Sequence, residues 1–150
     1  MNNSLIFIKA GTGELMEISS DNVVEMRVNI DNKDLIYRTA GELTFEKEIG
    51  ENKFYQVLKE GPNMFICIPE KKFVEADYNR IYGPDRRYDE FKLNNKYYIQ
   101  DSDNVLCRVQ LSEKSLAKMF PEKKELIKKV FKEDYYIDDE ARVISILENF

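Results

Sequence analysis

Three tyrosines and three arginines lie within residues 78–88, a stretch that also contains Gly83 and Pro84. Planar Arg and Tyr side chains bury a large area at little entropic cost, and they are enriched at the centres of protein interfaces. The segment therefore predicts a surface that binds another protein. The alternative is a structured loop in which these side chains cover a sheet edge. The candidate binding residues are Tyr78, Arg80, Tyr82, Arg86, Arg87 and Tyr88.

Residues for acid–base or nucleophilic catalysis are harder to single out. The chain has no histidine, which removes the commonest general base and the usual partner of a Ser or Cys nucleophile. Its 28 acidic residues could supply the carboxylate pair of a hydrolase, but their abundance singles out no pair. We therefore assign no catalytic residue. A small hydrolase that uses acidic residues is the alternative to a binding protein.

Two short motifs resemble ligand sites without the residues that such sites need. Asp101-Ser102-Asp103-Asn104 begins like a calcium loop, but the twelfth position is Ser112 rather than glutamate. Gly11-Thr12-Gly13 has neither the third glycine nor the lysine of a phosphate loop. Both segments predict turns, and the sequence predicts no metal ion and no cofactor.

The two cysteines, Cys67 and Cys107, each lie in an apolar run. One interpretation is two buried free thiols that act as small hydrophobic side chains. The other is a disulfide between neighbouring strands, which would imply an oxidising compartment. The distance between their Cα atoms decides between these interpretations.

Charge and hydropathy restrict the possible partners. The net charge of −5 gives no support for general nucleic-acid binding. No stretch is as long and apolar as a membrane span, and the four apolar residues after Ser4 are too few for a signal peptide. Lysines concentrate in residues 112–132, and acidic residues in 133–150. This pattern is typical of two solvated helices whose charges offset each other.

The hydrophobic period changes from two to about 3.6 near residue 112, and this change predicts the fold class. Before it, we expect short antiparallel strands at 5–9, 14–18, 23–30, 35–39, 42–48, 64–68, 73–77, 96–100 and 105–111. Residues 79–90 read as an exposed loop. Residues 53–60 have helical spacing and end at Gly61 and Pro62, which predicts a two-turn helix, with a strand as the alternative.

The last forty residues predict helices. Ser112 is a good N-cap, and Leu116, Met119 and Phe120 share one face of the first helix. Pro121 ends that helix and suits the first turn of the next. Asp138 or Asp139 caps a third helix, for which we expect an inner face of Val143, Ile144, Leu147 and Phe150.

The tail from Lys114 to Lys132, KSLAKMFPEKKELIKKVFK, resembles the ending of a group of Bacteroidota proteins with a β-rich body and a KSLLKLFPDKKKEIKKFIKEN-type tail. Residues 53–61 and 96–99 are also similar to that group. The resemblance covers residues 42–150. The group has no assigned activity, so the resemblance implies no site residues. Its members begin with a secretion signal, which implies a periplasmic or cell-envelope location if a signal peptide has been removed; the alternative is the cytoplasm.

Together these observations predict one α+β domain over residues 1–150. Its β-rich body, residues 1–111, forms an antiparallel meander that is curled or barrel-like, and its helical tail, residues 112–150, packs on that body. The function that we expect is a non-catalytic protein-interaction or binding module of the bacterial cell envelope, with another protein as partner.

Overall fold

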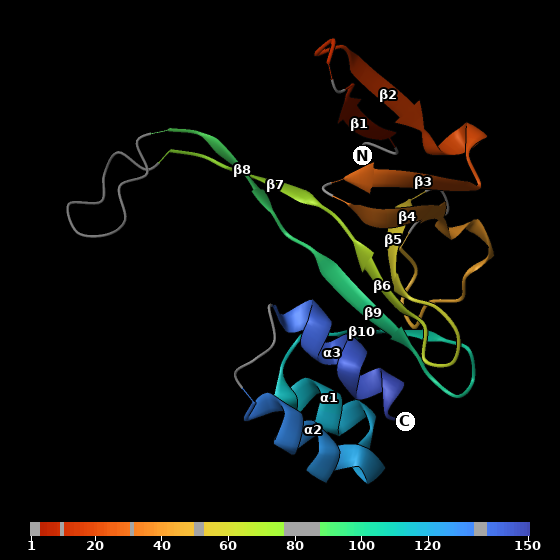
Figure 1. The fold of residues 1–150 in the computed structure, drawn as a ribbon, viewed down its shortest axis with the longest axis vertical. Helices are drawn as coiled ribbons and strands as arrows, with labels where there is room; N and C mark the ends of the chain where they lie inside the picture. Colours follow the sequence, from red (N-terminus) through yellow and green to blue (C-terminus); the bar gives the residue numbers. More distant parts are fainter. Residues whose placement is uncertain (1–3, 10, 31, 50–52, 77–87, 134–137) are drawn as a thin grey trace.

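The computed structural model describes residues 4–9, 11–30, 32–49, 53–76, 88–133 and 138–150 (Figure 1). Ten strands precede three α-helices in these ranges. The strands are β1 (Ser4–Ile8), β2 (Leu15–Ser19), β3 (Glu25–Ile30), β4 (Lys33–Thr39), β5 (Phe54–Lys59), β6 (Phe65–Ile68), β7 (Lys71–Val74), β8 (Glu90–Leu93), β9 (Lys96–Gln100) and β10 (Leu106–Val109). The helices are α1 (Glu113–Met119), α2 (Lys124–Phe131) and α3 (Asp139–Glu148).

Six strands form one open antiparallel sheet in the order β10-β9-β6-β5-β4-β3. The α+β class and the antiparallel meander are confirmed, as is the order of a β-rich body followed by helices. The sheet curls but does not close into a barrel.

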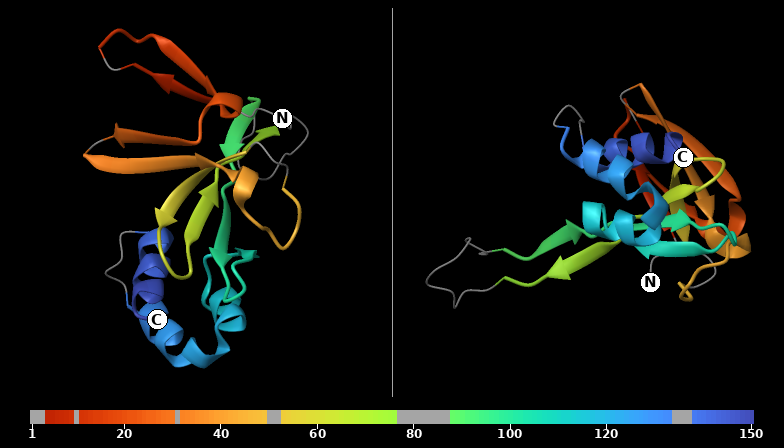
Figure 2. Two further views of the ribbon diagram at one scale, coloured as in Figure 1. Left: turned by 90° about the vertical axis from the view of Figure 1, so that its right-hand side faces the viewer. Right: turned by 90° about the horizontal axis from the view of Figure 1, so that it is seen from below.

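A two-stranded arm projects from this sheet (Figures 1 and 2). Strand β7 continues the direction of β6, and β8 leads into β9, with the backbone hydrogen bond from Asn94 to Glu70 at the junction. Residues 79–90 were expected to be a loop, but Glu90 begins β8. That short strand forms because Glu90–Leu93 pairs with Lys71–Val74, a partner that is remote in the sequence.

The sheet buries apolar side chains on both faces. The three helices cover one face, where Phe65 and Ile99 of the sheet pack against Leu116, Ile127 and Ile146 of the helices. Residues 40–49 cross the other face. There, Leu43, Phe45 and Ile49 pack on a second cluster formed by Ala40, Tyr55, Val57, Ile66, Ile68, Tyr98 and Leu106.

Residues 43–49 form what we call the strap, and they do not form the strand expected at 42–48. Only an isolated parallel bridge joins Phe45 to Leu106. Hydrogen bonds from Glu46 N to Leu106 O and from Leu106 N to Thr44 O hold it beside β10. The alternation of apolar and polar residues had suggested a strand. In the structure it places the side chains of Leu43 and Phe45 against the sheet.

The helix expected at residues 53–60 is wrong, and the strand alternative is correct. Phe54–Lys59 pairs with β4 on one side and with β6 on the other. Tyr55 and Val57 face one core while Leu58 contacts the other, so apolar residues occur on both faces of the strand. This double burial produced a spacing that looked helical.

The tail forms the expected helices with the expected caps. The Ser112 hydroxyl accepts a hydrogen bond from Ser115 N, and the Asp138 carboxylate accepts one from Ala141 N. Pro121 opens a 3-10 turn before α2. The prediction for the inner face of α3 was partly wrong. Ile146 is fully buried with Val143 and Leu147, while Ile144 and Phe150 are only partly buried.

Strands β1 and β2 pair with each other in a separate two-stranded sheet. In the sequence they come directly before the strands of the six-stranded sheet. Ile8 and Leu15 lie opposite each other in the register, and both are exposed. Figure 2 shows this hairpin apart from the helices, at the end of the molecule where β3 and β4 lie.

Candidate functional site

Most of the Arg/Tyr segment lies outside the described residues. Tyr78, Arg80, Tyr82, Arg86 and Arg87 fall in residues 77–87, so their role as binding residues stays a prediction. Tyr88 is described, and 82% of its surface is exposed. The Asp89 carboxylate accepts a hydrogen bond of 2.9 Å from Ala76 N, which joins the two strands of the arm near Tyr88.

The arm carries an exposed apolar surface that the sequence analysis missed. Phe73 and Phe91 are paired across β7 and β8, and their ring centroids are 5.2 Å apart. Leu93 lies on the same face because it is two residues from Phe91. The exposed fractions are 46% for Phe73, 70% for Phe91 and 70% for Leu93. The opposite face presents Lys72 and Lys92. We call Phe73, Phe91 and Leu93 the arm patch.

A sequence signal for the arm patch exists. Phe73 follows two lysines, and Phe91 and Leu93 flank Lys92, which is the period-two alternation of a strand. What the alternation could not reveal is that the apolar side of this ribbon covers no core. The described helices and strap cover the main sheet, whereas the arm extends beyond both (Figure 2).

Four neighbouring strands bring a row of charges to the strap side of the sheet. Lys53 precedes β5, Glu70 follows β6, Lys96 begins β9, and Arg108 lies in β10. The Glu70 carboxylate is 3.2 Å from Lys53 Nζ and 2.7 Å from Lys96 Nζ. Burial raises the pKa of Glu70, but the hydrogen bonds from these two lysines outweigh it and hold the pKa below its usual value.

Comparisons with protein-family models, with curated proteins and with solved structures give no match.

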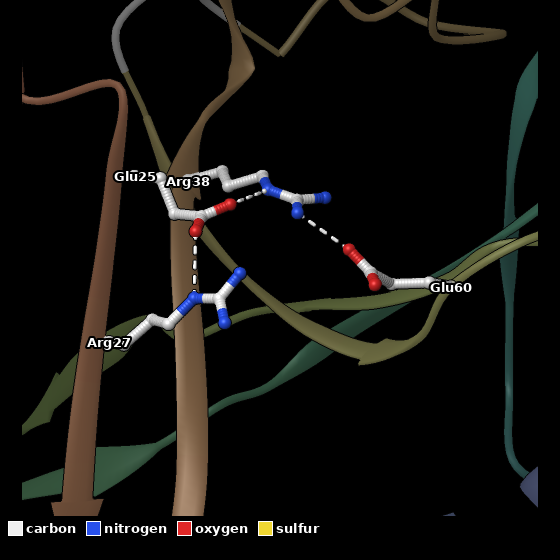
Figure 3. A network of polar contacts seen from close by, with 4 residues as sticks. All are labelled: Glu25, Arg27, Arg38 and Glu60. Carbon is white, nitrogen blue, oxygen red and sulfur yellow. Dashed lines mark hydrogen bonds and ion pairs between the residues drawn. The ribbon is translucent and has the colours of Figure 1, made fainter.

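A second charge network crosses β3, β4 and the residue that follows β5 (Figure 3). Arg38 Nε is 2.7 Å from Glu25 Oε2, and Arg38 Nη2 is 2.5 Å from Glu60 Oε1. Arg27 Nε contacts the other Glu25 oxygen at 2.9 Å. The hydrogen bond from Arg38, followed by that from Arg27, lowers the pKa of Glu25. Each carboxylate in this network has a cationic partner, so the network joins strands rather than forming a reactive site.

The two thiols are free, and Cys67 is buried while Cys107 is partly buried. They lie on β6 and β10, with β9 between them, and their register partners on β9 are two residues apart, so their Cα atoms are about 12 Å apart at the usual strand spacing. A disulfide requires less than about 7 Å. Burial, and then the charge of Glu140, raises the pKa of Cys67 to about 12, so this thiol is not activated as a nucleophile.

Asp101, which begins the calcium-like motif, stabilises a turn. Asp101 Oδ1 accepts hydrogen bonds of 2.9 Å from both Asp103 N and Val105 N, which closes the turn between β9 and β10. These bonds lower the pKa of Asp101, with Val105 as the main cause. Within the described ranges, no group of three His, Cys, Asp or Glu side chains could hold a metal ion. No helix in those ranges is long and apolar enough to cross a membrane.

Proposed function

We propose that this chain is a non-catalytic protein-interaction module that binds its partner with the arm. The observation that carries the proposal is the arm patch, an apolar surface in which the rings of Phe73 and Phe91 are in contact with their planes inclined by 54°. Exposed apolar groups on a projecting ribbon are typical of interaction sites, because solvent exposure of such a surface is unfavourable. Aromatic side chains that are already held in place lose little entropy on binding.

The Arg/Tyr segment extends this proposal. In the sequence, residues 78–88 lie between Phe73 of β7 and Phe91 of β8. Phe, Arg and Tyr are residue types that are enriched in binding hot spots, so the composition of this part of the chain favours a protein interface. The cell-envelope location is part of the proposal and is supported by the Bacteroidota resemblance of the tail.

A hydrolase with acidic residues is the alternative, and the carboxyl pKa values favour the interaction module. A general acid near neutral pH needs a raised pKa. Glu25, Glu70 and Asp101 each have a lowered pKa. Cationic or backbone donors hold these groups as carboxylates, which suits structural pairing.

Capture by the immobilised full chain from a bacterial envelope extract tests the proposal. The variant Phe73→Ser/Phe91→Ser removes the arm patch, and Arg86→Ala/Tyr88→Ala changes the adjoining segment. We expect each to reduce capture of a specific partner about tenfold or more, since loss of a hot-spot residue costs about 2 kcal/mol. The melting temperature should stay nearly unchanged, because Phe91 and Tyr88 are exposed.

The matched control changes the lysines of the tail. Lys123→Glu/Lys124→Glu/Lys128→Glu reverses three charges on the helices and should leave capture almost unchanged, because exposed lysines are strongly hydrated and contribute little individually. The proposal is wrong if these reversals abolish capture while the arm variants bind normally. It is also wrong if no protein is captured in a saturable way.

A further inference from the structure

We propose that the cleft between the strap and the sheet binds a small organic anion, with its phosphate or carboxylate group held by Arg108 and Lys96. The cleft has a volume of about 720 Å³. That volume falls within the range of small-molecule sites, about 300–1,000 Å³. The inference does not depend on the arm.

The strand order places Lys96 and Arg108 on adjacent strands. Strands β5, β6, β9 and β10 are consecutive neighbours in the sheet. Ile68 is paired with Lys96, and Tyr98 with Arg108, so Lys96, Tyr98 and Arg108 share the strap side of the sheet. Lys53, Glu70, Lys96 and Arg108 form a diagonal row across the four strands, with Lys53 and Arg108 at its opposite ends, and all of them line the cleft.

The charges in this row do not balance. Glu70 is the only acid in it, and it pairs with both Lys53 and Lys96. The side chains of these three residues are 22–28% exposed, so solvent screens the excess positive charge incompletely. The structure gives Arg108 no hydrogen bond or ion pair among the described residues, and its guanidinium is exposed.

The strap changes this balance only partly. It contributes Lys47 together with Glu46 and Glu48, so its own net charge is −1. The row on the sheet has a net charge of +2, and the lining as a whole stays positive. An oxyanion would pair with Arg108, because a guanidinium binds two oxygens of a phosphate or carboxylate at once and Lys96 lies on the adjacent strand.

The neighbouring cleft gives an internal contrast. It lies at the start of α3, has a volume of about 660 Å³, and shares Lys96 and Arg108 with the first cleft. Its three acids are already engaged. Asp138 caps α3, Asp139 pairs with Arg142 at 2.6 Å, and Glu140 accepts a hydrogen bond of 2.7 Å from Tyr97. Arg108 lines both clefts, but only the lining of the strap-side cleft has a net positive charge.

The remaining walls define the rest of the ligand. Ile49, Ile68 and the Tyr98 ring line the strap-side cleft. Tyr98 is held by an edge-to-face contact with Phe45 of the strap, whose centroid is 5.2 Å away. A ligand with one anionic group would place its charge on Arg108 and the apolar part of its body against Ile49, which is partly exposed, whereas Ile68 and Tyr98 are only 2% and 6% exposed.

Titration of the full chain with phenyl phosphate, benzoate and phenol, followed by ¹H–¹⁵N NMR, tests the inference. We expect saturable shifts with phenyl phosphate or benzoate at the backbone amides of Ile49, Ile68, Lys96 and Arg108, and none with neutral phenol. The stronger of the two anions identifies the preferred group. Arg108→Gln should weaken binding about tenfold, as expected for loss of a charged hydrogen-bond donor. Lys96→Met should also weaken it.

Arg27→Gln is the matched control, since it removes the same charge from β3 at the far edge of the sheet. It should leave the titration unchanged. Shifts that never saturate, or shifts spread over the lysines of α2, would overturn the inference. So would equal weakening by Arg108→Gln and Arg27→Gln, because that result would indicate only a general effect of net charge.

Discussion

Tyr97 on β9 donates a hydrogen bond of 2.7 Å to the Glu140 carboxylate on α3. The two residues are 43 positions apart in the sequence, and their contact fixes the first turn of the last helix on the central part of the sheet. Cys67, on the neighbouring strand, lies opposite Tyr97 in the register. The interface between tail and sheet therefore combines an apolar core with one polar contact.

Replacing Tyr97 by Phe should destabilise the fold by about 1–2 kcal/mol, because the charged Glu140 loses a partly buried donor. At this chain length the melting temperature should fall by roughly 2–8 °C in a thermal scan. Tyr98→Phe is the matched control. The Tyr98 hydroxyl makes no hydrogen bond among the described residues, so its removal should change the melting temperature less. Equal losses would show that the Tyr97–Glu140 contact contributes nothing specific.

Stability should decrease in alkaline solution. Burial is the main cause that raises the pKa of Tyr97 from 10.0 to about 12 and the pKa of Cys67 from 9.0 to about 12. Both groups are almost fully protonated in the folded and unfolded chains below about pH 8. As the pH rises, the unfolded chain ionises first, so the free energy of unfolding falls until about pH 12.

Urea unfolding between pH 8 and pH 12 measures this dependence. The double variant Cys67→Ala/Tyr97→Phe lacks both groups, and its free energy of unfolding should change less steeply with pH than that of the unaltered chain. An identical slope in the two proteins would contradict the assignment.

Ile146 and Ile144 differ by one half-turn of α3 and should respond differently to truncation. Ile146 is fully buried among the residues of the helix–sheet core, whereas Ile144 is partly exposed. Ile146→Ala should cost about 2–5 kcal/mol through lost burial and a residual cavity. Ile144→Ala should cost less than half of that. Chemical denaturation of both variants measures the two losses in unfolding free energy. A larger loss for Ile144→Ala than for Ile146→Ala would mean that α3 packs with the face first expected from the sequence.

Removal of residues 112–150 should leave a chain that aggregates or does not fold. Phe65 and Ile99 are fully buried in the core between the sheet and the helices, which also contains residues of all three helices. Each large side chain that becomes exposed costs about 1.5–3 kcal/mol. Circular dichroism and light scattering of the shortened protein test this. A soluble product with a cooperative melting transition and an unchanged strand signal would be the contrary result.

The two thiols should label at different rates. Cys107 is partly buried and its Sγ lies 3.6 Å from Asp101, while Cys67 is 1% exposed beneath the helices. With a thiol reagent at pH 8, we expect slow labelling at Cys107 and almost none at Cys67, and rapid labelling of both in denaturant. Mass spectrometry of the labelled chain assigns the sites. Mild oxidation should form no bond between them, because β9 separates their strands.

Several local features could be read from the sequence because neighbouring residues determine them. Ser112 and Asp138 cap their helices with their own side chains, and Pro121 begins a turn because it lacks an amide hydrogen. The hairpin around Asp101–Asn104 follows from turn residues between two apolar runs. These elements, taken in order, also predict the α+β class.

Other features depend on residues that are distant in the sequence. Phe54, Val57 and Leu58 have helical spacing, yet β4 and β6 pair with both sides of this segment and make it a strand. Pairing between β7 and β8 brings Phe73 to Phe91, and strand order brings Lys53 and Lys96 to Glu70. Local periodicity cannot reveal such neighbours, because it reports which side a residue faces and not what lies opposite. The caps, the turns and the fold class could be predicted from the sequence. The arm patch and the charged cleft could not, because burial and pairing depend on contacts between separate elements.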